Sequence, residues 1–211
     1  MCVMSSRGHR AGTAERAASS RAPLRVGFVT GATPDKWARA WRERHRRRLE
    51  LVPVTEADQE RLLREGELDM CLVRLPVDRE GLHLIPLYEE IPVVVMGREH
   101  LLTLLDEVGL DDLAEEQLVA PERSGWTPSV EQLAWPEMSA KDAVETVAAG
   151  TGILIWPMSV ARLYHRRDVT YRPVVGLPPT TVGLAWLVER DDEETQAFVG
   201  VVRGRRANSS R

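Results

Sequence analysis

The chain has 211 residues, of which 43% are hydrophobic and 28% charged, and its formal net charge is −4. This composition is that of an ordinary globular protein, long enough for one domain or two small lobes. Residues 1–22 carry a net charge of +3 and residues 203–211 carry +4, so the segment between them carries −11. A basic tail at each end of an acidic body argues against a protein built around a nucleic-acid groove.

Two cysteines, Cys2 and Cys71, are too few for a disulfide framework, and the five histidines show neither HxxxH nor HExxH spacing. We therefore expect no metal site and no cofactor. The N-terminal stretch lacks the apolar segment of a secretory signal, and no run approaches the length of a membrane span. These features predict a cytoplasmic protein without membrane contact, with a disordered basic tail at 1–23 and a second basic tail at 204–211.

The first third of the chain predicts a β-α-β-α-β order. Three segments are mostly apolar, as is typical of buried parallel strands: 24–31, 49–54 and 68–75. Thr33 and Pro34 mark the start of the first helix, as N-cap and first-turn proline. Thr55 opens a capping box for the second helix, and Gly66 is suited to its C-terminal cap.

The stretch "LREGELDMCLVRLP", residues 63–76, joins the second helix to the third strand. Ligands of open α/β sheets bind beyond the carboxyl ends of the strands. Asp69 lies near the start of the strand and is therefore predicted to stabilise the turn between the helix and the strand. Arg74 lies near the end of the strand and is predicted to contact ligand. A structural salt bridge is the alternative for Arg74, because a charge that interrupts an apolar strand needs a partner.

The rest of the chain predicts a second α/β block, followed by one long strand and a helix that return to the first block. Residues 83–102 contain two β-like runs, and "AWPEM" (134–138) is strand-like. Ser139 begins a capping box for a helix that the glycines after it close, and "ILIWP" is a buried strand. A helix and a strand follow. The long strand at 180–190 then leads to a terminal helix with acids in its first turn, as the helix dipole favours.

This pattern resembles the effector-binding domain of LysR-type transcriptional regulators. The resemblance rests on four segments in order, and it covers about 24–203: "LRVGFV", "LLREGELDMCLVRLP", "LYEEIPVVVMGREHLL" and "AVETVAAGTGILIWPMSVAR". It implies an α/β, two-lobe type 2 periplasmic-binding-protein-like fold, each lobe a mixed, mostly parallel sheet flanked by helices, with two crossing strands. Lobe I would comprise 24–77 plus 178–203 and lobe II 78–177, with a small-molecule effector in the cleft between them.

The resemblance has one departure. A full LysR regulator begins with a winged helix-turn-helix and a linker helix, whereas about 22 residues precede the first strand here. We therefore expect a stand-alone, non-enzymatic sensor of regulatory function that does not bind DNA directly by itself. Two alternatives stay open: an enzyme of the same fold acting on a small carboxylic metabolite, and a LysR regulator with a misassigned start.

Candidate ligand contacts lie in the loops that would border the cleft. They are Thr30, Gly31, Thr33, Thr55, Glu56, Arg74, Ser124, Gly125, Trp126 and Trp156. The first loop offers free backbone N–H groups at a helix start, with a plain N-cap as the alternative. By resemblance, position 56 often carries a hydroxyl, and the carboxylate of Glu56 would repel an acidic effector. Trp126, flanked by small residues, is placed to close over a ligand face.

The predicted partner is a small polar metabolite. By resemblance a homodimer is also expected, with the first helix of one subunit against lobe II of the other. The chain contains no GxSxG, P-loop or GxGxxG motif. We therefore expect no catalytic residues and no enzymatic activity.

Overall fold

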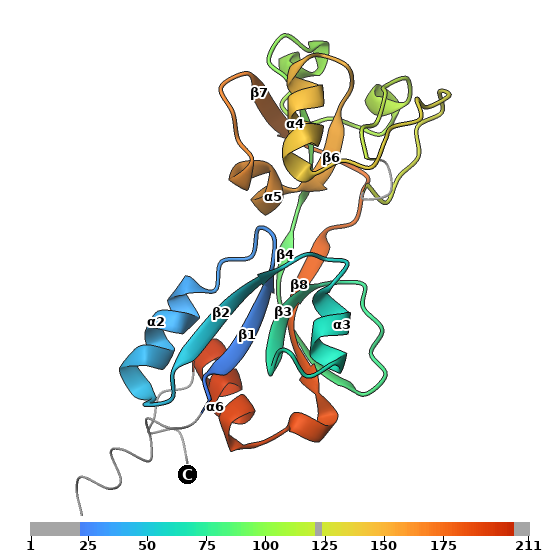
Figure 1. The fold of residues 1–211 in the computed structure, drawn as a ribbon. Helices are drawn as coiled ribbons and strands as arrows, with labels where there is room; N and C mark the ends of the chain where they lie inside the picture. The colour runs from blue at the N-terminus through green and yellow to red at the C-terminus, as the bar shows by residue number, and fades with distance from the viewer. Residues whose placement is uncertain (1–21, 121–123, 205–211) are drawn as a thin grey trace, which may run out of the picture.

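The computed structural model describes residues 22–120 and 124–204, which form two β-sheets with helices around them (Figure 1). The larger sheet has the strand order β2 (Leu49–Val54), β1 (Leu24–Val29), β3 (Met70–Arg74), β8 (Thr180–Leu187) and β4 (Leu82–Glu90). The smaller sheet has the order β6 (Leu154–Pro157), β5 (Pro92–Gly97) and β7 (Val169–Pro173). We call the elements around the larger sheet lobe I and those around the smaller sheet lobe II. The predicted α/β class is confirmed.

Lobe I follows the predicted β-α-β-α-β order. β1 runs parallel to β2 and β3, and the connections contain α2 (Asp35–Arg44) and α3 (Gln59–Arg64). All five residues of β3 are buried between β1 and β8, which explains why every residue of this strand except Arg74 is apolar. α6 (Glu193–Val202) packs on α2, where the rings of Trp41 and Phe198 lie 5.7 Å apart.

The two helix starts of lobe I differ from the prediction. α2 begins after Pro34 without a side-chain cap, so the predicted cap by Thr33 is wrong. Pro34 already has helical backbone angles, and its carbonyl accepts the first helical bonds. Thr55 does accept the predicted bond, from the N–H of Asp58 at 3.1 Å, but it closes a turn, and α3 starts only at Gln59.

The chain crosses between the lobes twice. β4 and β8 pair antiparallel along their length with one irregularity between Pro86 and Tyr88. β4 leads from lobe I to lobe II, and β8 leads back into lobe I (Figure 1). The predicted assignment of 78–177 to lobe II contains β4, whereas the hydrogen bonds of β4 belong to the sheet of lobe I. The lobe boundaries themselves stay a prediction.

The sheet of lobe II is antiparallel in its ladders, because β5 runs opposite to both β6 and β7. The prediction of a mostly parallel sheet is therefore wrong for this lobe. Parallel pairing occurs at two isolated bridges, Val108 with Val174 and Leu118 with Ile153. The chain around these bridges forms two 3-10 turns, η1 (Leu101–Leu104) and η2 (Asp111–Leu113), so no long strand extends either bridge.

Two helices cover lobe II, α4 (Ala140–Ala148) and α5 (Met158–Leu163). The predicted N-cap of α4 is confirmed, since the hydroxyl of Ser139 accepts from the N–H of Asp142. The predicted strand at 134–138 is absent from the structure of this segment, where Trp135 instead packs against the core of lobe II. Pro136 removes a backbone donor in the middle of that segment, which disfavours sheet pairing.

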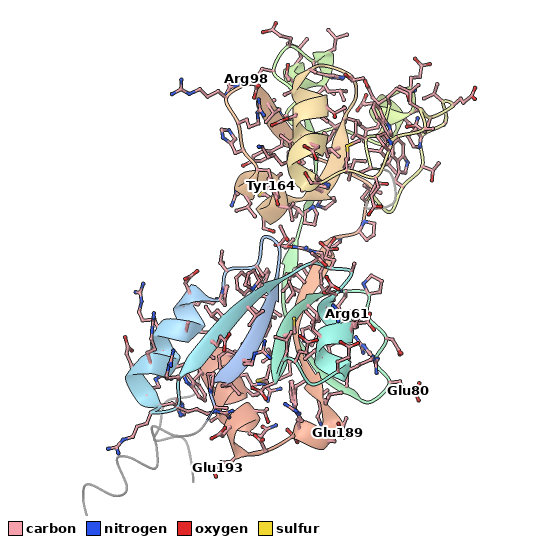
Figure 2. All side chains as sticks on the ribbon, in the orientation of Figure 1. Arg61, Glu80, Arg98, Tyr164, Glu189 and Glu193 are labelled. Carbon is pink, nitrogen blue, oxygen red and sulfur yellow. The ribbon has the colours of Figure 1, made fainter. Side chains whose placement is uncertain are left out.

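The junction before β3 has the predicted structural role. Gly66 ends α3 with φ at +71°, a conformation that glycine adopts without strain. Asp69 then accepts the backbone N–H of Arg25 at 2.8 Å and pairs with Arg190 at 2.8 Å. Glu189, next to Arg190 in the chain, lies at the end of lobe I farthest from lobe II (Figure 2). Asp69 therefore ties β1, β3 and the end of β8 together away from the lobe junction.

Of the helices in the described part of the chain, none combines the length and the hydropathy that crossing a membrane requires.

Replacing Asp69 with alanine should lower the free energy of unfolding by about 1–3 kcal/mol, because a backbone donor and an arginine lose their acceptor. Urea denaturation followed by circular dichroism measures this loss. Asp106→Ala is the matched control, since Asp106 is exposed. Equal stabilities of the two variants would contradict the structural role of Asp69.

Candidate functional site

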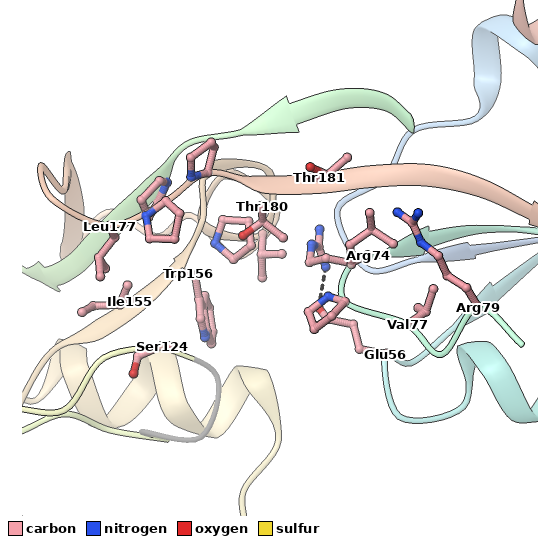
Figure 3. Close-up of a pocket in the computed structure, with 18 residues that line it drawn as sticks. Glu56, Arg74, Val77, Arg79, Ser124, Ile155, Trp156, Leu177, Thr180 and Thr181 are labelled. Atoms are coloured by element: carbon pink, nitrogen blue, oxygen red, sulfur yellow. Dashed lines mark hydrogen bonds and ion pairs between the residues drawn. The ribbon is translucent and has the colours of Figure 1, made fainter. Parts of the chain in front are cut away.

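A cavity of about 620 Å³ lies between the two lobes (Figure 3). Lobe I borders it at the carboxyl end of β3 and at the start of β8, and lobe II borders it at the end of β6 and on α5. This is the edge of the parallel strands at which open α/β sheets bind ligands. The volume lies in the range typical of small-molecule sites.

The wall contributed by lobe II is mainly apolar. It contains Ile155, Trp156, Pro157, Val160 and Leu177, together with Ser124 and Gly125. Trp156 is 3% exposed, and its ring packs against Tyr164 at 5.8 Å, on the side of lobe II that faces lobe I (Figure 2). The indole N–H of Trp156 is buried without a hydrogen-bond partner in the described structure. The wall is therefore hydrophobic, and it contains one polar group without a partner.

The wall contributed by lobe I carries the charged groups of the cavity beside the apolar Leu75, Pro76 and Val77. Glu56, Arg74 and Arg79 line it together with the hydroxyl residues Thr180 and Thr181, at the start of β8 (Figure 3). The cavity thus has a hydrophobic side and a charged side, which is the arrangement that fixes the orientation of an amphipathic ligand.

Arg74 is the most extensively bonded side chain of the polar wall. Its guanidinium donates to Glu90 from Nε at 3.2 Å and from Nη2 at 2.8 Å, to the carbonyl of Thr30 at 3.1 Å, and to Glu56 from Nη1. The side chain of Arg74 is 3% exposed and that of Glu90 is 5% exposed. Four of the five guanidinium N–H groups are therefore engaged by the protein. Of the two interpretations of Arg74, this geometry favours the structural ion pair.

The backbone of Arg74 is also held by a side chain. Gln59, 5% exposed at the start of α3, donates to the carbonyl of Arg74 at 3.0 Å and accepts its N–H at 2.9 Å. This pair of bonds attaches α3 to the end of β3. No role for Gln59 or Glu90 was predicted from the sequence. A carboxylate beside the apolar "IPVVV" segment is nevertheless a signal that a buried cation lies nearby.

Half of the predicted ligand contacts line the cavity: Glu56, Arg74, Ser124, Gly125 and Trp156. The others lie outside its lining. Thr33 is exposed, and Trp126 packs against the core of lobe II. Thr30 contributes its carbonyl to Arg74, and Thr55 holds the turn before α3.

Gly31 forms a contact between the lobes. Its φ is +89°, and a Cβ at this position would lie 2.4 Å from the hydroxyl oxygen of Ser159 and 3.1 Å from a methyl group of Val160. Ser159 and Val160 belong to α5 of lobe II. Gly31 therefore allows the loop after β1 to touch lobe II at the border of the cavity.

Among residues 22–120 and 124–204, no group of three or more His, Cys, Asp or Glu side chains is placed to hold a metal ion.

The LysR substrate binding domain matches this chain over residues 17–207. The chain belongs to the LysR substrate-binding domain family. Similar curated proteins are the HTH-type transcriptional regulator AlsR of Bacillus subtilis, 26% identical over 167 residues, and the Hca operon transcriptional activator HcaR of Escherichia coli, 27% identical over 174 residues. These matches cover 71% and 76% of this chain but 55% and 58% of the relatives. The chain thus spans little more than half the length of either regulator.

Solved structures of LysR-type effector domains share the fold. The reduced form of OxyR superposes with a TM-score of 0.72 at 19% identity, covering 89% of this chain and 97% of OxyR. The BenM effector-binding domain with its effector benzoate gives a TM-score of 0.70 at 21% identity, covering 86% of this chain and 90% of the BenM domain. These likenesses confirm the predicted fold of a LysR effector-binding domain.

Replacing Arg74 with methionine should lower the free energy of unfolding by about 3–5 kcal/mol, because the buried Glu90 then lacks its cation. The double variant Arg74→Met, Glu90→Leu should regain most of that loss, since no buried charge remains. Urea denaturation measures both. If Arg74→Met alone unfolds at the wild-type urea concentration, the ion pair is not structural.

Replacing Gly31 with alanine should destabilise the protein by more than the roughly 1–2 kcal/mol that left-handed backbone strain costs. The excess comes from the clash with α5. Gly81→Ala is the matched control, because Gly81 also has positive φ (+69°) but no atom lies within 4 Å of its added Cβ. Denaturation compares the two variants, and equal losses would show that Gly31 makes no tight contact with lobe II.

Proposed function

We propose that this chain is the effector-sensing part of a LysR-type regulator and that it binds a small metabolite in the cavity between the lobes. The observation that carries the proposal is a cavity of about 620 Å³ with walls from both lobes, the charged groups on the lobe I side and a mainly apolar surface on the lobe II side. A ligand that contacts both walls stabilises the arrangement in which both lie against it, and thereby changes the population of lobe arrangements. A partner segment that reads this arrangement would convert binding into regulation.

Binding is favoured over thiol oxidation as the sensing chemistry. Cys71 is the one cysteine within the described residues, and it is buried in β3. Burial raises the pKa of its thiol to about 12. A thiol with so little thiolate at neutral pH is a poor nucleophile toward an oxidant. The proposal therefore places sensing in the cavity rather than at Cys71.

Several finer points of the function stay predictions: a non-enzymatic role, a homodimer, and the absence of sequence-specific DNA binding by this chain alone. Assays of turnover, sedimentation equilibrium and gel shift test them in that order. The mass of the chain is 23.7 kDa, so a sedimentation mass of twice this value supports the dimer.

A screen of polar metabolites should find compounds that raise the melting temperature. At a ligand concentration of one hundred times Kd, binding to the native state alone adds about 2.7 kcal/mol. For a chain of this size the rise is roughly 5–10 °C. Thr180→Trp, which places an indole in the cavity, should abolish the rise. A rise that persists in Thr180→Trp would place the ligand elsewhere.

The matched control is Thr170→Trp. Thr170 is also a half-buried threonine in a strand, but it lies in β7 and outside the cavity lining. This variant should keep the ligand-induced rise. If both variants lose it, the loss comes from the added indole in general and not from the cavity.

A further inference from the structure

The charges beside the cavity are unequal. The Arg74 cluster, which consists of Arg74, Glu56 and Glu90, contains one guanidinium and two carboxylates. Glu90 is buried and accepts two bonds from Arg74, so most of the cation's interaction goes to this partner. The cluster as a whole therefore carries one excess negative charge.

The excess charge is accessible at Glu56. The side chain of Glu56 is 48% exposed and lines the cavity, whereas that of Arg74 is 3% exposed behind it. One carboxylate oxygen of Glu56 accepts a hydrogen bond from Arg74. An ionised carboxylate has about four acceptor sites, so Glu56 can accept further hydrogen bonds from a ligand. A molecule in the cavity therefore meets the carboxylate of Glu56 before it meets the guanidinium of Arg74.

Arg79 is the competing charge. It lines the cavity from lobe I, but its side chain is exposed. Charges that face bulk water are screened by salt, and ion pairs at such positions contribute little. The side chain of Glu56 is 48% exposed, but its bond to the buried Arg74 holds it against low-dielectric protein, where a charge is screened less than in bulk water. We therefore take the carboxylate of Glu56 as the charge that selects the ligand.

The opposite wall defines the rest of the ligand. Trp156 with Ile155 and Val160 offers an apolar surface that suits a flat hydrophobic body. An aromatic face also attracts a cation, which adds to the preference set by Glu56. The hydroxyls of Thr180 and Thr181 can accept the remaining protons of an ammonium group.

We propose that the cavity takes a small cationic ligand, an amine with a flat apolar body. Its ammonium group is bound by Glu56, and its body lies against Trp156. This inference rests on the proposed function, because it concerns the same cavity, and it adds the chemical class of the ligand.

Three indole compounds with the same ring and similar side chains test the charge. Tryptamine carries a cation, tryptophol is neutral, and indole-3-propionate carries an anion. Isothermal titration at pH 7 and low salt should give the tightest binding for tryptamine, about tenfold tighter than tryptophol, as one charge-assisted bond supplies. Indole-3-propionate should bind most weakly.

Glu56→Gln identifies the group responsible. Glutamine keeps an acceptor oxygen for Arg74, so the cluster stays bonded, but it removes the charge. Tryptamine and tryptophol should then bind within about threefold of each other. Glu65→Gln makes the same change at the other end of α3, outside the cavity lining, and it should keep the tenfold preference.

Three results would overturn the proposal. Tighter binding of indole-3-propionate, lost in Arg79→Gln, would show that the charged subsite is at Arg79. A tryptamine preference that survives Glu56→Gln would remove the role of Glu56. Failure of all three compounds to bind would show that the amine class is wrong. A metabolite that raises the melting temperature of the wild type but not of Thr180→Trp would then still support the proposed function, so the two failures are distinguishable.

Discussion

The guanidinium of Arg74 joins three segments of lobe I at the border of the cavity. Through Glu90 it holds the end of β4, where the chain crosses to lobe II, and through the carbonyl of Thr30 it holds the loop after β1. Through Glu56 it holds the turn before α3. Since the next residue of the loop, Gly31, touches α5, the same ion cluster sets where the two lobes meet. The position of both cavity walls therefore depends on one buried cation.

A buried cation of this kind is costly unless its donors are engaged by the protein. Arg74 meets that condition with two carboxylates and one carbonyl. Because four of the five guanidinium N–H groups are engaged by the fold, the proposed ligand would be recognised by other residues of the cavity lining. Among these are Glu56, Arg79, Thr180 and Thr181. The cluster thus has a buried part, Arg74 and Glu90, and an accessible part, Glu56.

Local patterns predict lobe I well and lobe II less well, for a physical reason. In the first part of lobe I, β1 and β2 are each followed by a helix, and right-handed crossovers bring β2 and β3 to either side of β1 in parallel. In lobe II the neighbours of β5 are β6 and β7, which lie about 60 and 75 positions later in the chain. Their antiparallel direction follows from how the intervening irregular segments pack, and no local pattern encodes it.

The sequence by itself determined the α/β class, the order of the elements in lobe I, the structural role of Asp69 and the family. The first three follow from short-range patterns of apolar and charged residues and glycines, which act within one or two turns of the chain. The family follows from the resemblance of four segments to the LysR effector-binding domain. The tertiary structure alone decided what Arg74 does. Its main partner, Glu90, lies 16 residues away on a strand separated from β3 by β8. Whether a charged strand end meets a ligand or a protein carboxylate depends on that distant packing, because an ion pair is set by position in space and not by spacing along the chain.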